Sequence, residues 1–118
     1  MKGIDILGII MKCSIDQHKK KIIEQKYCCE LPEIVSKIIT VAEEPIFFNS
    51  NRILSFDEIC EAEEEFNVSF IEKQMIPLID CSDNDFIVYH FDSKKWSKFN
   101  IVDECVFKEK ESLYELLK

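Results

Sequence analysis

Glycine is almost absent from this chain of 118 residues, which carries only Gly3 and Gly8. A loop that cradles a nucleotide phosphate needs several glycines at fixed spacing, so a phosphate-binding loop of that kind is excluded. Histidine is equally scarce, and no motif pairs His18 or His90 with a cysteine as a base is paired with a nucleophile. We therefore expect a protein that is not an enzyme.

Long apolar runs are missing as well, and none approaches the roughly 20 residues that cross a bilayer as a helix. The first residues carry Lys2 and Asp5 and no small-residue cleavage site, unlike a signal peptide. The 47% hydrophobic and 32% charged composition is typical of a globular protein, and the length suits one domain over residues 1–118. We expect a cytoplasmic protein that does not enter a membrane.

The six cysteines form no C-x-x-C pair and have no histidine at zinc-ligand spacing, which excludes the usual zinc and redox motifs. Scattered cysteines of a cytoplasmic protein are expected to stay reduced and to pack as small apolar side chains. The adjacent Cys28 and Cys29 have two interpretations. Either one thiol packs inward and the other is partly exposed near a helix end, or the pair responds to oxidation.

Basic residues are few in the middle of the chain. The formal net charge is −8, and residues 41–85 hold twelve carboxylates but only Arg52 and Lys73 as basic side chains. A face this acidic repels phosphates, which disfavours nucleic-acid binding, and it speeds the encounter with a basic protein. The alternative is that the acidic segment serves solubility alone.

Apolar patterning places the secondary structure. Residues 76–91 are predicted to form a β-hairpin, because two apolar runs flank the polar turn Cys81–Asp85. Side chains along Phe86–Phe91 are apolar on both faces, which predicts a strand covered on both sides. Other predicted strands cover residues 46–48, 52–54, 96–101 and 106–108, and predicted helices cover residues 1–13, 15–27, 32–42, 55–66 and 113–117.

Polar residues mark where these helices are expected to begin. Ser14 with Gln17, and Ser55 with Glu58, have the spacing of capping boxes. Pro32 is expected at the first helical position, where the N–H that proline lacks would have no helical partner. The N-terminal segment 1–13 is expected to be a helical extension. Its predicted apolar face carries Ile4, Leu7, Ile10 and Met11.

The helix predicted over residues 55–66 is strongly acidic. At 100° per residue, five carboxylates are expected to point away from its apolar face. They are Asp57, Glu58, Glu61, Glu64 and Glu65. Glu63 falls within the apolar stripe, where an unpaired carboxylate is costly, and Arg52, the only arginine in the chain, is its expected partner.

The hairpin turn gathers Asp80, Asp83, Asn84 and Asp85, which offer the oxygen ligands that calcium and magnesium prefer. An EF-hand loop needs acidic groups at alternate positions, a central glycine and a distal glutamate, and this turn contains no glycine. Neither a metal nor a cofactor is therefore expected. An enzyme that uses this acidic cluster is the alternative left open.

Several segments resemble the SUKH superfamily, whose members include fungal cell-wall assembly regulators and bacterial immunity proteins. The resemblance spans residues 20–118, and Ser82, Asp83 and Asn84 stand where many relatives carry glycine. The segments that carry it are Leu31-Pro32, Ile53–Ile59, Ile76–Asp80, Asn84–Tyr89, Trp96–Asn100 and Ser112–Leu117. It implies an α+β fold with a single domain, in which helices flank a mixed or mainly antiparallel sheet.

The resemblance also implies a binding protein without catalytic activity, in bacteria often an immunity protein that neutralises a toxin, frequently a nuclease. This expectation agrees with the charge pattern, because an acidic surface complements the basic substrate cleft of a nuclease. The alternative is a regulatory or scaffolding module of the cell-wall regulator kind. The expected contacts with a basic toxin domain are Glu61, Glu64, Glu65, Asp83 and Asp85.

Overall fold

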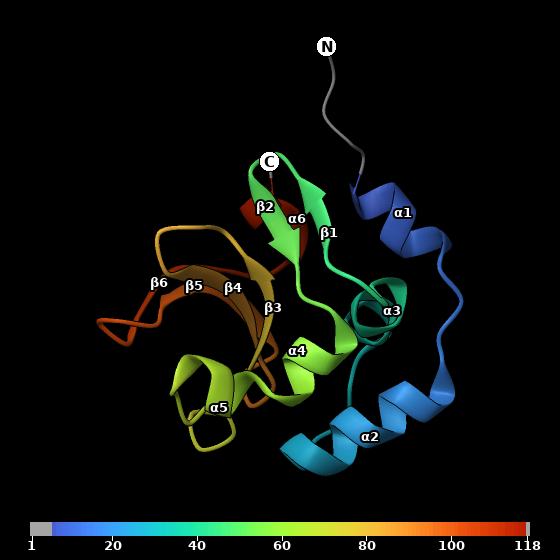
Figure 1. The fold of residues 1–118 in the computed structure, drawn as a ribbon, viewed down its shortest axis with the longest axis horizontal. Coiled ribbons are helices and arrows are strands. Elements are labelled where there is room, and N and C mark those ends of the chain that lie inside the picture. The colour runs from blue at the N-terminus through green and yellow to red at the C-terminus, as the bar shows by residue number, and fades with distance from the viewer. Residues whose placement is uncertain (1–5, 118) are drawn as a thin grey trace.

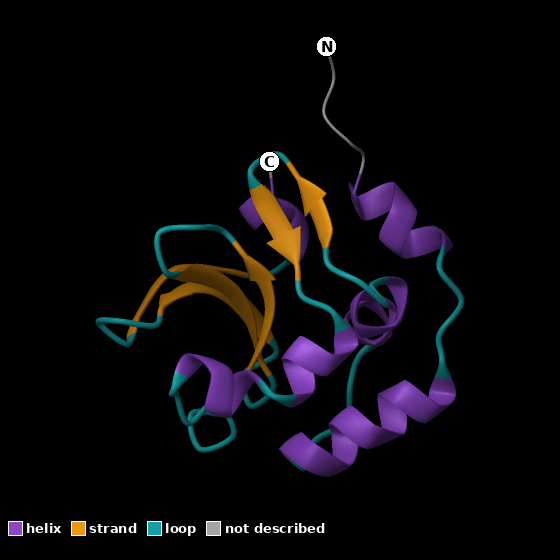
Figure 2. Ribbon diagram, in the orientation of Figure 1, coloured by secondary structure: helices purple, strands orange, loops and turns teal. Residues whose placement is uncertain are grey.

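Six helices and six strands are arranged in blocks along residues 6–117, the part of the chain that the computed structural model describes (Figures 1 and 2). The helices are α1 (Ile6–Lys12), α2 (Gln17–Tyr27), α3 (Glu33–Val41), α4 (Phe56–Cys60), α5 (Ala62–Phe66) and α6 (Leu113–Leu117). The strands are β1 (Ile46–Phe48), β2 (Asn51–Ile53), β3 (Met75–Asp80), β4 (Asp85–His90), β5 (Lys95–Asn100) and β6 (Cys105–Lys110). None of these helices has the length and apolar character needed to cross a membrane.

The six strands form one sheet in which the order in space is the order in the chain. Every neighbouring pair is antiparallel, so the expected α+β fold is confirmed and the sheet has no parallel pair within the described residues. The register between β3 and β4 shifts between Pro77 and Ile79. Proline cannot donate a hydrogen bond to a neighbouring strand, and such irregularities are where sheets tolerate it.

Both faces of the sheet are covered, as the apolar pattern of residues 86–91 predicted. On one face the ring of Phe66 in α5 lies 4.6 Å from that of Phe86, measured between centroids. On the other face the ring of Tyr27 in α2 lies 6.3 Å from that of Phe91. Figure 1 shows β3 to β6 as a strongly curved sheet with α5 on its inner side and the N-terminal helices beyond β3.

The helices join the sheet through a shared apolar core. Val35, Ile38 and Ile39 of α3 are fully buried, at the three- and four-residue spacing that puts them on one side of a helix. Ile6 and Ile10 bring α1 into the same core, so α1 is packed against the domain. Each such side chain contributes about 1.5–3 kcal/mol relative to remaining in water.

Two of the predicted helix starts are wrong in detail. Asp16, rather than Ser14, caps α2, because its Oδ1 accepts hydrogen bonds from the backbone N–H groups of His18 and Lys19. Pro32 is the residue before α3 rather than its first helical residue. The capping box of Ser55 and Glu58 at the start of α4 is confirmed.

The face predicted for the first helix is also shifted. Met11 is 50% exposed, whereas Ile6, which the pattern did not select, is buried. Ile10 is buried as expected, and Ile4 lies outside the described residues. The spacing of apolar residues over seven helical positions fits more than one face, and packing against α3 decides between them.

All six cysteines are free. None is fully buried, so their expected role as core side chains is met only in part, by Cys29, Cys60 and Cys81 at the edge of the core. Cys28 is exposed and Cys29 is half-buried. This is the arrangement in which one thiol of the pair packs inward and the other is exposed near a helix end. Burial, with help from Glu24 and Cys28, raises the pKa of the Cys29 thiol to about 11.

The scarcity of glycine has a structural consequence. Eleven non-glycine residues in the described part of the chain have positive φ, among them Ser82, Asp83 and Asn84 in succession in the β3–β4 turn. Left-handed backbone costs about 1–2 kcal/mol for residues that have a Cβ, although asparagine and aspartate tolerate it better. The short turns between antiparallel strands therefore contain backbone strain that glycine would remove.

We predict that replacing Gln74, which has φ of 60°, by glycine stabilises the protein by about 0.5–1 kcal/mol. The matched control is Gln25→Gly in the middle of α2, where glycine is expected to destabilise by about 1 kcal/mol. Urea denaturation of both variants and the parent measures the two changes. Equal destabilisation by both substitutions would contradict the prediction.

Candidate functional site

The acidic segment 55–66 forms two short helices that meet at Glu61, not the single helix predicted. Glu61 ends α4 with φ of −102° and ψ of 9°, and Ala62, which follows it, is fully buried. The change of direction leaves Glu61, Glu64 and Glu65 exposed. Three of the five expected contact residues therefore lie on the surface of one short segment.

The other two expected contacts lie in and beside the β3–β4 turn and differ from each other. Asp83 is exposed, whereas Asp85 is half-buried and its Oδ1 accepts a hydrogen bond of 2.9 Å from the side-chain amide of Asn100. The backbone N–H of Ile101 donates to the carbonyl oxygen of Asn84 at 2.9 Å, which ties this turn to the β5–β6 turn. Asp83 is free to meet a partner, while Asp85 mainly organises the turn.

A ring contact connects α5 to the strand that follows the β3–β4 turn. Phe66 at the end of α5 lies 4.6 Å from Phe86 near the start of β4, measured between ring centroids. Figure 1 shows α5 below the curved sheet and the turn that follows β3 above it, so the sheet lies between them. The predicted residues therefore form two acidic groups, one on α5 and one in the β3–β4 turn.

The predicted pairing of Glu63 with Arg52 is wrong. The Oε2 atom of Glu63 accepts a hydrogen bond of 2.8 Å from the backbone N–H of Ile71, in the loop that follows α5. The cost of a partly buried carboxylate is thus offset by a backbone donor. Sequence reasoning missed this partner because the loop returns to the helix only in three dimensions.

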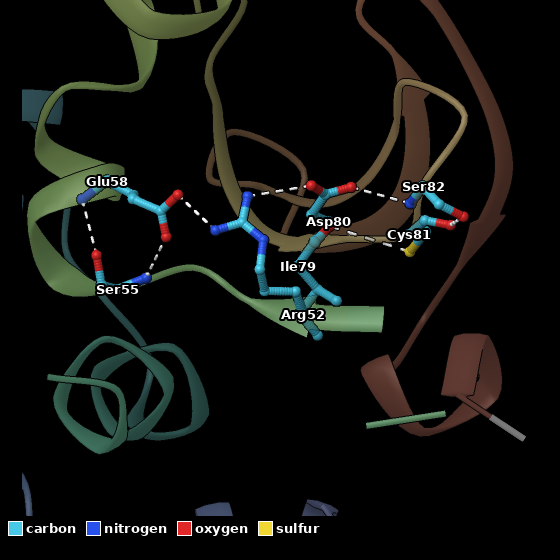
Figure 3. A network of polar contacts seen from close by, with 7 residues as sticks. All are labelled: Arg52, Ser55, Glu58, Ile79, Asp80, Cys81 and Ser82. Carbon is cyan, nitrogen blue, oxygen red and sulfur yellow. Dashed lines mark hydrogen bonds and ion pairs between the residues drawn. The ribbon is translucent and has the colours of Figure 1, made fainter. Parts of the chain in front are cut away.

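Arg52 instead lies between two other carboxylates (Figure 3). Its Nη1 atom is 2.5 Å from Oε2 of Glu58 in α4, and its Nη2 atom is 3.1 Å from Oδ2 of Asp80 at the end of β3. Glu58 also accepts from the backbone N–H of Ser55, and Asp80 accepts from that of Ser82. One guanidinium therefore fixes the start of α4 to two strands of the sheet.

This network corrects the expectation that Glu58 points to solvent with its acidic neighbours. The Glu58 side chain is only 27% exposed. Burial alone would raise the pKa of Glu58, but hydrogen bonds from Arg52 and Ser55 outweigh it and hold the pKa below its ordinary value. Burial likewise would lower the pKa of Arg52, and the hydrogen bonds to Glu58 and Asp80 reverse the shift, so this pKa is raised.

His90 and Cys81, two side chains of types that can act as a base or a nucleophile, are held in environments that do not activate them. Nε2 of His90 lies 2.5 Å from Oγ of Ser97, and burial lowers the pKa of His90 despite the opposing charges of Asp92 and Glu109. Burial raises the pKa of Cys81, which keeps this thiol protonated at neutral pH. Within residues 6–117, no three His, Cys, Asp or Glu side chains are arranged to hold a metal ion.

Phe47 is the surface feature that sequence reasoning missed. This side chain in β1 is 70% exposed, whereas the neighbouring Phe48 is 4% exposed. A groove of about 460 Å³ lies beside it. The groove is lined by Phe47, Phe48, Asn49, Ser50, Asn51, Arg52, Asp80 and Ser82. Strand alternation could have indicated that one of the two phenylalanines points outward, but not which one.

No family model matches this chain, and searches of curated proteins and of solved structures find no significant match.

We predict that Arg52→Met destabilises the protein by about 2–4 kcal/mol, because it leaves Glu58 and Asp80 partly buried without their cation. Lys110→Met, at an exposed position of β6, is the control and is expected to change the free energy of unfolding by less than about 0.5 kcal/mol. Chemical denaturation monitored by the fluorescence of Trp96 measures both. A loss of only a few tenths of a kcal/mol in Arg52→Met would show that the network is dispensable.

A second prediction concerns the loss of folding stability at low pH. Because the pKa of Glu58 is lower in the folded state than its ordinary value of 4.5, the unfolded state binds more protons as the pH falls below about 5. The stability that Glu58 supplies is therefore present above this value and lost as the pH falls through the folded pKa. Glu58→Gln should flatten the acid limb of the stability curve, whereas Glu30→Gln, at an exposed position, should leave it unchanged. Superimposable curves for both variants would refute the assignment.

Proposed function

We propose that this protein is a binding protein without catalytic activity, and that it neutralises a basic toxin domain as an immunity protein. The observation that carries the proposal is the exposure of Glu61, Glu64 and Glu65 on one short segment. The exposed Asp83 in the β3–β4 turn is a second acidic position. A basic cleft that binds a nucleic acid substrate attracts such a surface and can be covered by it.

The charge distribution supports this choice over a purely solubilising role. Twelve carboxylates lie within residues 41–85, and the single arginine there is already bound by Glu58 and Asp80. The remaining acidic side chains of the segment outnumber the nearby cations, although Lys19 of α2 lies 5.4 Å from the ring centroid of Phe56 in α4. The lysines of α2 lie on a different element. A partner with a basic patch would be steered to the acidic region and away from α2.

The α+β architecture with its antiparallel sheet is also what the resemblance to the SUKH superfamily implies. Fold alone does not establish function, so the proposal depends on the surface.

The first test is whether the adjacent reading frame encodes a toxin-like protein, and the direct test is survival of cells that produce that protein. The wild-type protein is expected to restore growth. The variant with Glu61, Glu64 and Glu65 all changed to Gln should bind the toxin domain at least about threefold more weakly, since each exposed charge pair contributes about 0.2–1 kcal/mol. It should also show a weaker dependence of the association rate on salt.

The matched control changes Glu30, Glu111 and Glu115 to Gln, which alters the net charge equally at exposed positions outside α5. This control should bind and protect as the wild type does. Equal killing with and without the wild-type protein would refute the proposed function. Equal loss in both triple variants would attribute the effect to net charge rather than to the α5 surface.

A further inference from the structure

β1 is an edge strand of the sheet, and its central residue, Phe47, is 70% exposed. Figure 1 shows β1 on the side of β2 that faces away from β3. The turn that joins β1 to β2 consists of Asn49 and Ser50, which both have positive φ, as tight two-residue hairpin turns require. An edge strand leaves one row of backbone N–H and C=O groups without a neighbouring strand.

The hydrogen-bond pattern of the sheet shows which backbone groups of β1 face outward. The N–H of Leu54, which follows β2, donates to the carbonyl oxygen of Leu78 in β3 at 2.9 Å. Because bonded and non-bonded positions alternate along antiparallel strands, the backbone groups of Arg52 also face β3. Phe47 lies opposite Arg52, so these two residues form a pair without hydrogen bonds between β1 and β2. The N–H and C=O groups of Phe47 consequently point to the free edge.

The two edges of the sheet differ in how they resist pairing with another strand. β6, at the opposite edge, has a register shift against β5, a positive φ at Lys108, and the charged side chains of Glu109 and Lys110. Charged side chains and bulges are the features that block strand pairing at an edge. β1 contains no charged residue, and its pairing with β2 has a regular register. Of the two edges, β1 is therefore the one suited to accept a further strand.

The position of Phe47 at the centre of β1 makes the strand complementary to a second copy of itself. When two β1 strands pair antiparallel with Phe47 opposite Phe47, each residue donates its outward N–H to the outward C=O of the other. The two rings then lie side by side on one face, as a favourable aromatic cross-strand pair. The same register sets Glu44 opposite Ser50 and Glu43 opposite Asn51, so no carboxylate lies directly opposite another.

We propose that the protein forms a twofold-symmetric dimer in which the β1 strands of two copies pair antiparallel about Phe47 and join the two sheets into one. Such an interface uses the same surface patch on both copies, which is the commonest arrangement in protein dimers. Pro45, which precedes β1, has no N–H to donate, so the pairing is short. A small interface makes a weak dimer, and we expect a dissociation constant on the order of 100 µM. This inference goes beyond the proposed function and does not depend on it.

Analytical ultracentrifugation of the full chain between about 10 µM and about 1 mM tests for the dimer, because its population rises with concentration. The wild type should change from monomer to dimer over this range. Phe47→Lys removes the aromatic pair and places two like charges opposite each other, so it should raise the dissociation constant at least about tenfold. Val102→Lys is the matched control, because Val102 in the β5–β6 turn is also 70% exposed. It should dimerise as the wild type does.

Hydrogen exchange of single amides, followed by NMR, locates the interface in the unmodified chain. The amide of Phe47 should exchange at least about threefold more slowly at the higher concentration than at the lower, because only the dimer supplies it with an acceptor. The amides of β6, at the opposite edge, should exchange at the same rate at both concentrations. This measurement needs no substitution, so it decides the question even if Phe47→Lys does not fold.

Three results would overturn the inference. The first is a wild-type chain that stays monomeric at every concentration. The second is a dimer that Phe47→Lys leaves intact, or in which the amide of Phe47 gains no protection, since the copies then meet through another surface. The third is an equal loss of the dimer in both lysine variants, which would attribute the effect to net charge rather than to β1.

Discussion

The contact on which the architecture depends is the pair of ion pairs made by Arg52. One side chain joins three elements that are distant in the chain: β2, the capping box of α4 and the end of β3. Because Glu58 both caps α4 and binds Arg52, the position of the helix is coupled to the register of the sheet. A hydrophobic core alone allows helices to slide, whereas directional charged hydrogen bonds fix their place.

This coupling determines where the acidic surface lies. α4 is held to the sheet at its start, the chain turns at Glu61, and α5 then packs Phe66 against Phe86 on the inner side of the curved sheet. The carboxylates left on the outside of α5 are therefore presented by a rigid support. On the other side of the Arg52 network lies the groove beside Phe47.

Sequence reasoning recovered what depends on local pattern. The β3–β4 hairpin, the two covered faces of β4, the capping box at Ser55 and the terminal helix are all confirmed, because each is encoded by neighbouring residues. The predicted partners of charged side chains were wrong where the partner lies in another segment of the chain. The partner of Glu63 comes from a loop eight residues away, and Arg52 binds Asp80, which is 28 residues away. The break at Glu61 also reflects tertiary packing, since the helix propensity of residues 55–66 favours continuation.

The candidate site was predicted in part for the same reason. Helical periodicity predicts that Glu61, Glu64 and Glu65 are exposed, and they remain exposed although the helix is interrupted at Glu61. The hydrogen bond from Asn100 to Asp85, in contrast, depends on the pairing of β4 with β5. The outward direction of Phe47 depends on which face of β1 meets the core. Hydrophobicity alone does not distinguish it from Phe48, since both are phenylalanine and only one is buried.

The most direct measurement is hydrogen–deuterium exchange of the chain alone and in complex with a toxin-like domain encoded by an adjacent reading frame. The account predicts slower exchange in residues 61–66 and no change in α2. Protection centred on α2, with residues 61–66 unaffected, would contradict the claim that the protein binds its partner through the acidic surface of α5.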